Sequence, residues 1–379
     1  MTSSERWQRG RRGLLAGFLV LLMGACGLAV LGSVTTDTGV TGFLIGLTLA
    51  ALPVPVVVGA LRWLDRYEPE PAGLLLFAFF WGATVAALVS AVINTASLVA
   101  IARTSGGSGP EGMDTTAVLV APWVEEAAKG AAVLLVLLYR RREVDGVVDG
   151  IVLAGLAGVG FAFTENVLYF GRAFLAGQEQ DLTTGIFATG VTFLLRGVLS
   201  PFAHPLFTAM TGIGLGLAAR SSRPAVRVGA PLAGYLAAVA LHAGWNLASL
   251  SGLQGFFTGY VLVMVPAFAL TVGLAAWSRR REGAIVAARL PAYVDAGWLD
   301  PADVSMLASL PRRRQAVAWT ERRTGRAGAR ALRQFQQAAT ELAFLRDRLE
   351  RGLHVPDFAL RERELLQDVA SARTAALSP

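Results

Sequence analysis

The sequence predicts an all-α fold: a polytopic membrane helix bundle of about eight transmembrane helices, followed by a helical cytoplasmic tail. Three observations lead to this class. Of the 379 residues, 54% are hydrophobic and only 16% are charged, and the mean hydropathy is +0.52. Apolar runs of spanning length recur along the chain, and arginines flank these runs on alternating sides. Together they exclude an ordinary soluble globular protein.

The expected spans are the apolar segments that reach the length of about 20 residues that a bilayer requires. They lie at 13–34, 40–60, 73–101, 117–138, 147–171, 185–218, 229–250 and 255–277. One set of span ends is rich in arginine, namely Arg6, Arg9, Arg11, Arg12, Arg62, Arg66, Arg140, Arg141, Arg142, Arg220, Arg223, Arg227, Arg279, Arg280 and Arg281. The opposite ends carry only Arg103 and Arg172. With eight spans both termini fall on the arginine-rich side, which the positive-inside rule makes cytoplasmic.

Two domains are expected, a membrane domain at 1–277 and an Arg-rich helical cytoplasmic domain at 278–379. The second holds 18 Arg against 12 Asp and Glu, which accounts for +6 of the net charge of +7. No aromatic residues interleave with a basic patch there, so a surface beside anionic lipid is favoured over a nucleic-acid interface. The single cysteine, Cys26, excludes an intrachain disulfide framework.

Backbone irregularity is expected in two of the spans. Pro201 and Pro205 should kink or break the segment 185–218 near 200–205, because proline removes a backbone donor and clashes with the preceding turn. Pro122 should bend or start the helix in 117–138. Irregular backbone at membrane depth requires cover by protein or a cavity, so both spans indicate a cavity.

Charged residues interrupt the apolar segment 117–138, where Glu125, Glu126 and Lys129 lie within two helical turns. Lys129 is the only lysine of the chain, whose other 33 basic residues are arginine. A charged group at bilayer depth costs at least about 2.5 kcal/mol, so it persists mainly where it faces a partner or a water-filled cavity. Glu125 and Lys129 are four residues apart and share a helix face, whereas Glu126 points about 100° away.

Three further polar groups follow on the next three spans. They are Glu165 with Asn166, His204 with Thr208, and His242 with Asn246, where Phe161 and Trp245 belong to the same stretches. Each has a structural explanation when it is taken alone, because a membrane histidine or asparagine often only bonds a neighbouring helix. Three carboxylates, two histidines and two asparagines on four consecutive helices would be a costly way to hold a bundle together, so the set indicates an active site.

Hydrolysis is the chemistry that suits this set. A carboxylate in an apolar cavity can take a proton from water. Imidazoles and a carboxylate could hold zinc or another divalent metal that activates that water. Without a metal, the glutamate alone would activate water while histidine and asparagine donate hydrogen bonds to the oxyanion. No HExxH motif occurs, so any metal site must be assembled between helices.

The ordered motifs Glu-Glu-x-x-Lys, Phe-x-x-x-Glu-Asn, His-x-x-x-Thr and His-x-x-Trp-Asn resemble the PrsW family of bacterial intramembrane proteases over roughly residues 61–248. That family is distantly related to CAAX prenyl endopeptidases and bacteriocin-processing membrane proteases. The resemblance implies that Glu125 and Glu126 are catalytic and that Glu165, His204 and His242 line the same site. The family is generally treated as metal-dependent, whereas the related prenyl endopeptidases use a glutamate-activated water, and the resemblance does not decide between the two. It also implies a bacterial inner membrane and a membrane-anchored protein substrate, such as an anti-sigma factor of envelope stress signalling.

The leading interpretation is therefore an intramembrane endopeptidase with Glu125 as the general base. Lys129 is expected to act as a counter-charge and Asn246 as an oxyanion donor. Glu126 and Glu165 are expected to tune the base or bind metal, and Asn166, next to Glu165, belongs to the catalytic set. His204 and His242 are expected to bind the metal or the developing oxyanion. The alternatives are a proton-coupled transporter that uses the same residues as a relay, although no internal repeat of the motifs is found, and a scaffold that acts through its tail. The oligomeric state is not indicated.

Overall fold

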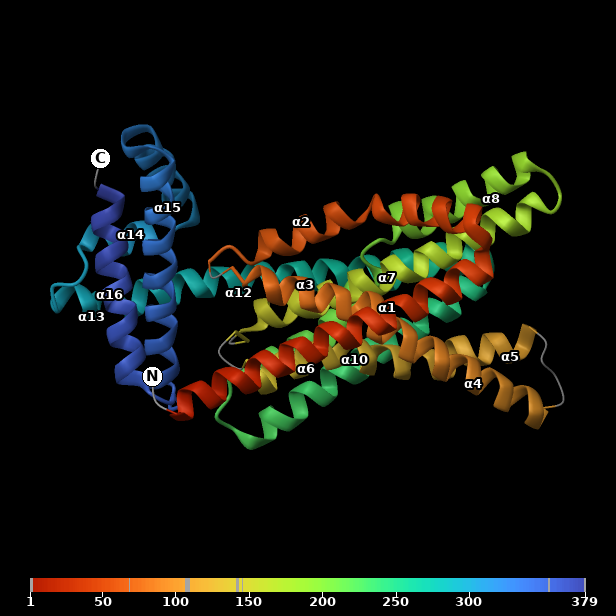
Figure 1. Cartoon of the computed structure of the whole chain (residues 1–379), viewed down its shortest axis with the longest axis horizontal. Coiled ribbons are helices and arrows are strands. Elements are labelled where there is room, and N and C mark those ends of the chain that lie inside the picture. Colours follow the sequence, from red (N-terminus) through yellow and green to blue (C-terminus); the bar gives the residue numbers. More distant parts are fainter. Residues whose placement is uncertain are drawn as a thin grey trace. The chain divides into compact units, whose positions relative to one another are not determined.

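The computed structural model describes residues 3–67, 69–105, 110–140, 143–144, 146–353 and 355–377 (Figure 1). Every regular element in this part of the chain is helical, which confirms the predicted all-α class. Arg141 and Arg142, which contribute to the predicted topology, lie outside the described residues, as do the side chains of residues 1–12.

The chain forms two compact units. The first comprises residues 1–61, 71–219 and 228–271, and the second comprises 62–70, 220–227 and 272–379. The division therefore lies at Thr271 and Val272, inside helix α12 (Val265–Arg289), whereas the predicted boundary was 277/278. Two short loops that were assigned to the membrane domain also belong to the second unit.

The elements up to α12 alternate α-helices with short π-helical segments, labelled η. They are α1 (Ser3–Ala51), α2 (Val54–Leu64), α3 (Ala72–Phe80), η1 (Trp81–Ala86), α4 (Ala87–Ser105), α5 (Pro110–Thr115), η2 (Thr116–Val120), α6 (Ala121–Tyr139), α7 (Val147–Gln178), α8 (Leu182–Phe193), η3 (Leu194–Leu199), α9 (Ala203–Ala219), α10 (Pro224–Leu250), α11 (Gly252–Gly259) and η4 (Tyr260–Met264). The helices after α12 are α13 (Pro291–Asp295), α14 (Pro301–Leu307), α15 (Leu310–Glu350) and α16 (Phe358–Leu377).

Helix α1 is interrupted at Gly39, whose dihedral angles of φ 61° and ψ 173° are not helical. A positive φ of this kind is accessible to glycine because it has no Cβ. Figure 1 shows the red N-terminal segment reversing its direction before it continues into α2. The reversal agrees with two separate expected spans, 13–34 and 40–60.

Six helical stretches among the described residues are long and apolar enough to cross a membrane. They are Gly13–Leu64, Ala72–Arg103, Val147–Gln178, Leu182–Ala219, Pro224–Leu250 and Gly252–Asp295. The first contains two of the expected spans. The expected span 117–138 is not among the six, because α6 carries three charged residues within its 19. The total of eight spans stays a prediction.

Helix α7 is the centre of the first unit. In its most apolar window 78% of the residues are buried, against 11% for α10. Glycine permits this central position, because it lets helix backbones approach closely. A Cβ built on Gly150 of α7 would lie 2.1 Å from the carbonyl oxygen of Gly212 on α9, and one on Gly160 would lie 1.9 Å from that of Phe79 on α3. These crossings hold α7 against α3 and against α9, the helix that carries His204.

The two expected irregularities are both present. The segment 185–218 is broken where η3 ends at Leu199, since Ser200 has φ −125° and ψ 36° and α9 starts at Ala203. Helix α6 begins at Ala121 with Pro122 in its first turn, directly after η2. The backbone therefore changes its helical type just before two of the polar motifs, as π-helical segments frequently do beside functional sites.

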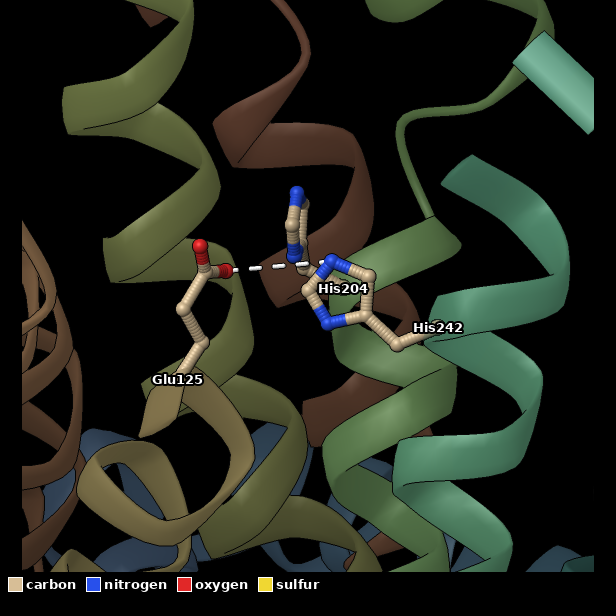
Figure 2. Close-up of side chains that lie close together, drawn as sticks. All are labelled: Glu125, His204 and His242. Atoms are coloured by element: carbon tan, nitrogen blue, oxygen red, sulfur yellow. Dashed lines mark ion pairs between the residues drawn. The ribbon is translucent and has the colours of Figure 1, made fainter. Parts of the chain in front are cut away.

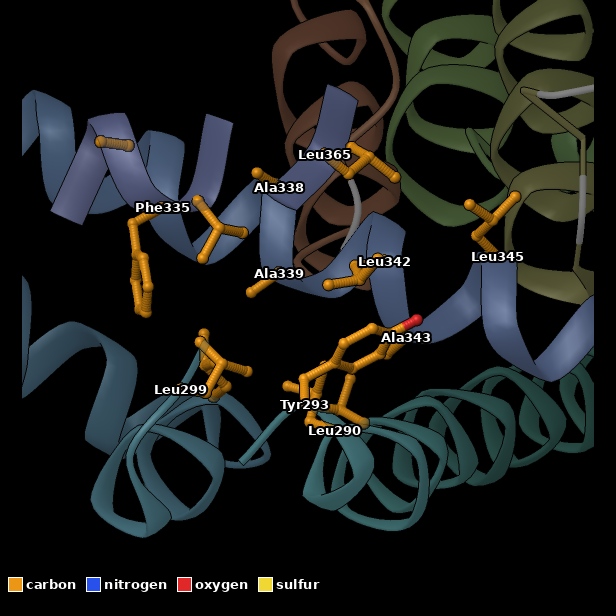
Figure 3. Packing of buried hydrophobic residues seen from close by; sticks show 14 residues of the cluster. Leu290, Tyr293, Leu299, Phe335, Ala338, Ala339, Leu342, Ala343, Leu345 and Leu365 are labelled. Atoms are coloured by element: carbon orange, nitrogen blue, oxygen red, sulfur yellow. The ribbon is translucent and has the colours of Figure 1, made fainter. Parts of the chain in front are cut away.

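The second unit has its own hydrophobic core, shown in Figure 3. Phe335, Leu342 and Leu345 of α15 are buried there, whereas Leu349 is 41% exposed. Asp300 precedes α14, and its backbone N–H donates to Asp303 Oδ2 at 2.9 Å. The unit therefore has a hydrophobic core of its own.

We expect Gly150→Ala to destabilise the protein by about 1–3 kcal/mol, because the new methyl group would overlap the backbone of α9. Thermal unfolding in detergent measures this change. Gly190→Ala in α8 is the matched control, since a Cβ there meets nothing within 4 Å, and helix propensity makes that change neutral or favourable by up to about 1 kcal/mol. Equal melting temperatures for the two variants would contradict the proposed close packing.

Candidate active site

Four helices of the first unit bring most of the predicted site residues into one buried cluster. Helix α6 carries Glu125, Glu126 and Lys129, and α7 carries Glu165. The two histidines come from α9 and α10, since His204 follows the break after η3 and His242 lies in the second half of α10. All of these side chains are buried except Glu165, which is about one-fifth exposed.

The shortest contact between charged groups on α6 joins Lys129 Nζ to Glu126 Oε1, at 2.6 Å. Both side chains are completely buried. Glu125 Oε2 lies farther from the same ammonium, at 3.7 Å. The sequence analysis paired Lys129 with Glu125 on one helix face, but residues three apart are helix neighbours as well. Lys129 therefore lies between both carboxylates and is bonded more closely to Glu126.

Glu126 has a full set of partners. The Thr208 hydroxyl donates to Oε2 at 2.9 Å, and Nδ1 of His242 lies 2.9 Å from Oε1. Because a carboxylate accepts hydrogen bonds, Nδ1 of His242 carries the proton and donates it. Nε2 of His242 is then the nitrogen with the lone pair, and it lies 3.8 Å from Glu125 Oε2.

Glu125 contrasts with Glu126. Its Oε1 accepts a hydrogen bond from Asn94 Nδ2 on α4 at 3.3 Å. Its Oε2 is buried and has no hydrogen-bond partner among the described residues. Figure 2 shows the carboxylate of Glu125 directed at the imidazoles of His204 and His242. Leaving a buried acceptor without a donor costs about 1–3 kcal/mol, so a water molecule or a cation bound to this oxygen would stabilise it.

His204 is held by charged groups on both ring nitrogens. Nε2 lies 2.8 Å from Glu165 Oε2, and Nδ1 lies 3.2 Å from Lys129 Nζ. An ammonium can only donate, so Nδ1 accepts and Nε2 donates to the carboxylate. The rings of His204 and His242 are 5.1 Å apart between centroids. One donor atom each from Glu125, His204 and His242 lies within 4.8 Å of the others, which is a spacing that a metal ion can bridge.

Glu165 has a second partner that the sequence analysis did not assign to the site. Arg196 of η3 donates to Glu165 Oε2 at 2.5 Å and to Asn166 Oδ1 at 2.9 Å. Its guanidinium also lies 3.9 Å from the ring of Tyr169. Arg196 and Glu165 are 26% and 22% exposed, so this pair forms the more open side of the cluster.

Asn246 lies apart from these contacts, because its amide donates to Ala117 O at 2.8 Å. This bond ties α10 to η2. The aromatic ring of Phe161 contacts the cluster directly, since Lys129 Nζ lies 4.3 Å from its centroid. Trp245 packs in the apolar cluster that includes Phe207 and Phe256.

Three functional residues were missed by sequence reasoning. Asn94 is an isolated polar residue in an apolar segment, which was an available but weak signal. Arg196 is a charged residue inside the apolar segment 185–218, which was a signal of the same kind. Thr208 was part of a motif but received no role. All three bond a glutamate of the cluster.

We expect Lys129→Met to destabilise the protein by about 3–5 kcal/mol, because it leaves the buried Glu126 without its cation. Thermal unfolding in detergent gives the measurement. Lys129→Met combined with Glu126→Gln removes both charges and should recover much of the loss. If the single variant were as stable as the wild type, or if the double variant were less stable than the single one, the ion pair would not stabilise the fold.

Comparison with known proteins agrees with this geometry. No curated protein and no solved structure matches the chain. A family model described as "PrsW family intramembrane metalloprotease" matches residues 70–271, which include every residue of the cluster and more than half of the chain. The chain belongs to the PrsW family of intramembrane metalloproteases.

Proposed function

We propose that the protein hydrolyses a peptide bond of a membrane-anchored protein at the cluster formed by Glu125, His204 and His242. The observation that supports this most is the buried Glu125 Oε2, which has no hydrogen-bond partner among the described residues. A polar atom in that state is stabilised once it binds a water molecule or a cation. Glu125 is accordingly the residue that takes the proton from the attacking water.

The neighbouring residues hold this arrangement. Asn94 occupies Glu125 Oε1 and so aims Oε2 into the cluster. Glu126 orients His242, and Glu165 orients His204, each by accepting a ring N–H. Carboxylates in this position fix the tautomer and the ring direction of a histidine. We therefore give Glu165 an orienting role in place of the metal-ligand role that the sequence analysis predicted.

The residues present fit a divalent metal, and zinc is the one that suits them best. Two imidazole nitrogens and one carboxylate oxygen are the ligand set of many catalytic zinc sites, with bond lengths of about 2.0–2.2 Å. Glu125 Oε2 and His242 Nε2, 3.8 Å apart, can both reach one such ion. Glu125 would then be a ligand of the metal, and its role as the base belongs to the site without the metal. Bound there, the metal would polarise a carbonyl group and make water easier to deprotonate.

Lys129 limits how His204 can take part in metal binding. Its ammonium donates to Nδ1 of His204, which is the nitrogen that carries the lone pair. A cation held by His204 at this nitrogen would have to replace Lys129 there, and the ion pair of Lys129 with Glu126 would remain. The main role of Lys129 is therefore to balance the charge of Glu126. The side-chain amide of Asn246 has two N–H donors, and one of them is used by Ala117 O, so only the other is available to an oxyanion.

The finer assignments of substrate and location rest on the family and on charge. We propose an anti-sigma factor as the substrate class, and a bacterial inner membrane as the location, because both accompany the resemblance. The arginine-rich span ends support an orientation with both termini in the cytoplasm. The family match does not favour a proton-coupled transporter.

Glu125→Gln should lower cleavage of a fluorogenic transmembrane peptide by about 10²–10⁴-fold, because the amide cannot accept the proton of water. The assay uses purified protein in detergent. Glu179→Gln, at an exposed position after α7, removes a carboxylate elsewhere and should retain wild-type activity. Full cleavage by the Glu125 variant would sink its assignment as the base.

Elemental analysis of the purified protein should find about one zinc ion per chain, and His242→Ala should lose it. His354→Ala changes the third histidine of the chain and provides the control. A chelator should remove the metal and the peptide cleavage together. Metal-free protein that still cleaves with the help of Glu125 would move the mechanism to a glutamate-activated water.

A further inference from the structure

The second unit contains a basic cavity of about 320 Å³ that the proposed function does not use. Four arginines line it, namely Arg66, Arg279, Arg280 and Arg314, together with Trp63 and Tyr67. No aspartate or glutamate is among the residues that line it. We call this site the arginine cavity.

The four arginines of the cavity make no described ion pair, although burial and a nearby described acid, Glu282, raise the pKa of the lining residue Tyr67. Elsewhere in the same unit arginines pair with acids, as Arg289 does with Asp347 and Arg346 with Glu350. Like charges gathered around a cavity repel one another and set up a positive potential, which an anion in the cavity would relieve.

Hydrogen bonds and a cation–π contact fix the residues that line the cavity. The guanidinium of Arg279 lies 4.1 Å from the Trp63 ring centroid, and it donates to Trp63 O at 3.3 Å. The hydroxyl of Tyr67 donates to Ala308 O at 2.9 Å. Behind Tyr67, the buried Arg313 donates to Tyr67 O at 3.2 Å and to Thr340 Oγ1 at 2.6 Å. The cavity is therefore held by long-range contacts and does not depend on one flexible loop.

Residues that line the cavity follow apolar helices in the sequence. Trp63 and Arg66 directly follow the apolar part of α2, which ends at Leu61. Arg279 and Arg280 directly follow the apolar part of α12, which ends at Trp277. Trp63 and Trp277 are 44% and 55% exposed. Tryptophan and arginine at the ends of apolar helices are typical of the level of lipid headgroups.

We propose that the arginine cavity binds the phosphate-bearing headgroup of an anionic phospholipid. A guanidinium matches a phosphate because it can donate two parallel hydrogen bonds, and it needs less dehydration than an ammonium does. The position after two apolar helices puts lipid phosphate within reach and favours a lipid over a soluble phosphate. The opening residues of α15 also line the cavity, and the positive end of that helix adds to the charge that the arginines supply.

Native mass spectrometry of the full chain tests this proposal. The purified protein is mixed with equal amounts of phosphatidylglycerol and phosphatidylcholine in detergent, and the retained lipid is counted. Wild type should retain phosphatidylglycerol, and R66Q/R314Q should retain it about tenfold less, because each basic residue near a membrane surface contributes to binding anionic lipid. Arg66 and Arg314 are both exposed, so folding should tolerate their replacement. R280Q alone is the second variant, with an intermediate loss expected.

R322Q/R326Q is the matched control, because it removes the same charge from exposed positions of the same unit outside the cavity. It should retain phosphatidylglycerol as wild type does. An equal loss in this control would reduce the effect to unspecific charge attraction and overturn the site. Undiminished retention by both cavity variants would overturn it too. If excess glycerol phosphate bound in the cavity and displaced the lipid completely, the site would recognise a soluble phosphate and the lipid proposal would be wrong.

Discussion

The ion pair between Lys129 and Glu126 is the constraint on which the rest of the membrane unit depends. Both groups are completely buried, and an ammonium in such a place needs partners on every side. Lys129 finds them in Glu126 on its own helix, in His204 on α9 and in the ring of Phe161 on α7. One charge thereby sets the relative positions of three helices. Glu126 adds a fourth, since it accepts a hydrogen bond from His242 of α10.

Such short contacts are only possible because the helix backbones come very close together. The crossing of α7 and α9 relies on Gly150 and Gly212, and Gly158 plays the same part nearer the cluster, since a Cβ on it would lie 2.7 Å from the backbone of His204. Large side chains at these positions would separate the helices and draw His204 away from Lys129 and Glu165. The close helix crossings at these glycines therefore make the polar contacts of the neighbouring cluster possible.

Much of the fold and the composition of the site can be predicted from the sequence because the informative residues are locally visible. Polar residues inside apolar segments identified Glu125, Glu126 and Lys129, and two prolines marked the break before His204. The pairing between residues could not be predicted in the same way. Lys129 can reach either Glu125 or Glu126, and its side-chain torsions decide between them. The hydrogen bond from Arg196 to Glu165 depends on the direction that the π-helical segment η3 gives to the arginine. Segment 62–70 belongs to the second unit because of contacts with residues far along the chain, such as Tyr67 with Ala308.

The absence of lysine everywhere but at position 129 has a practical consequence for chemical labelling. An amine-selective reagent finds one side-chain amine in this chain, and that amine is completely buried at the centre of the cluster. Its rate of modification therefore reports how often the helices part far enough to admit a small molecule, since a buried group reacts only through such openings. Isotope-labelled methyl groups on the same nitrogen would give an NMR signal from the buried cluster that overlaps with no other side-chain amine.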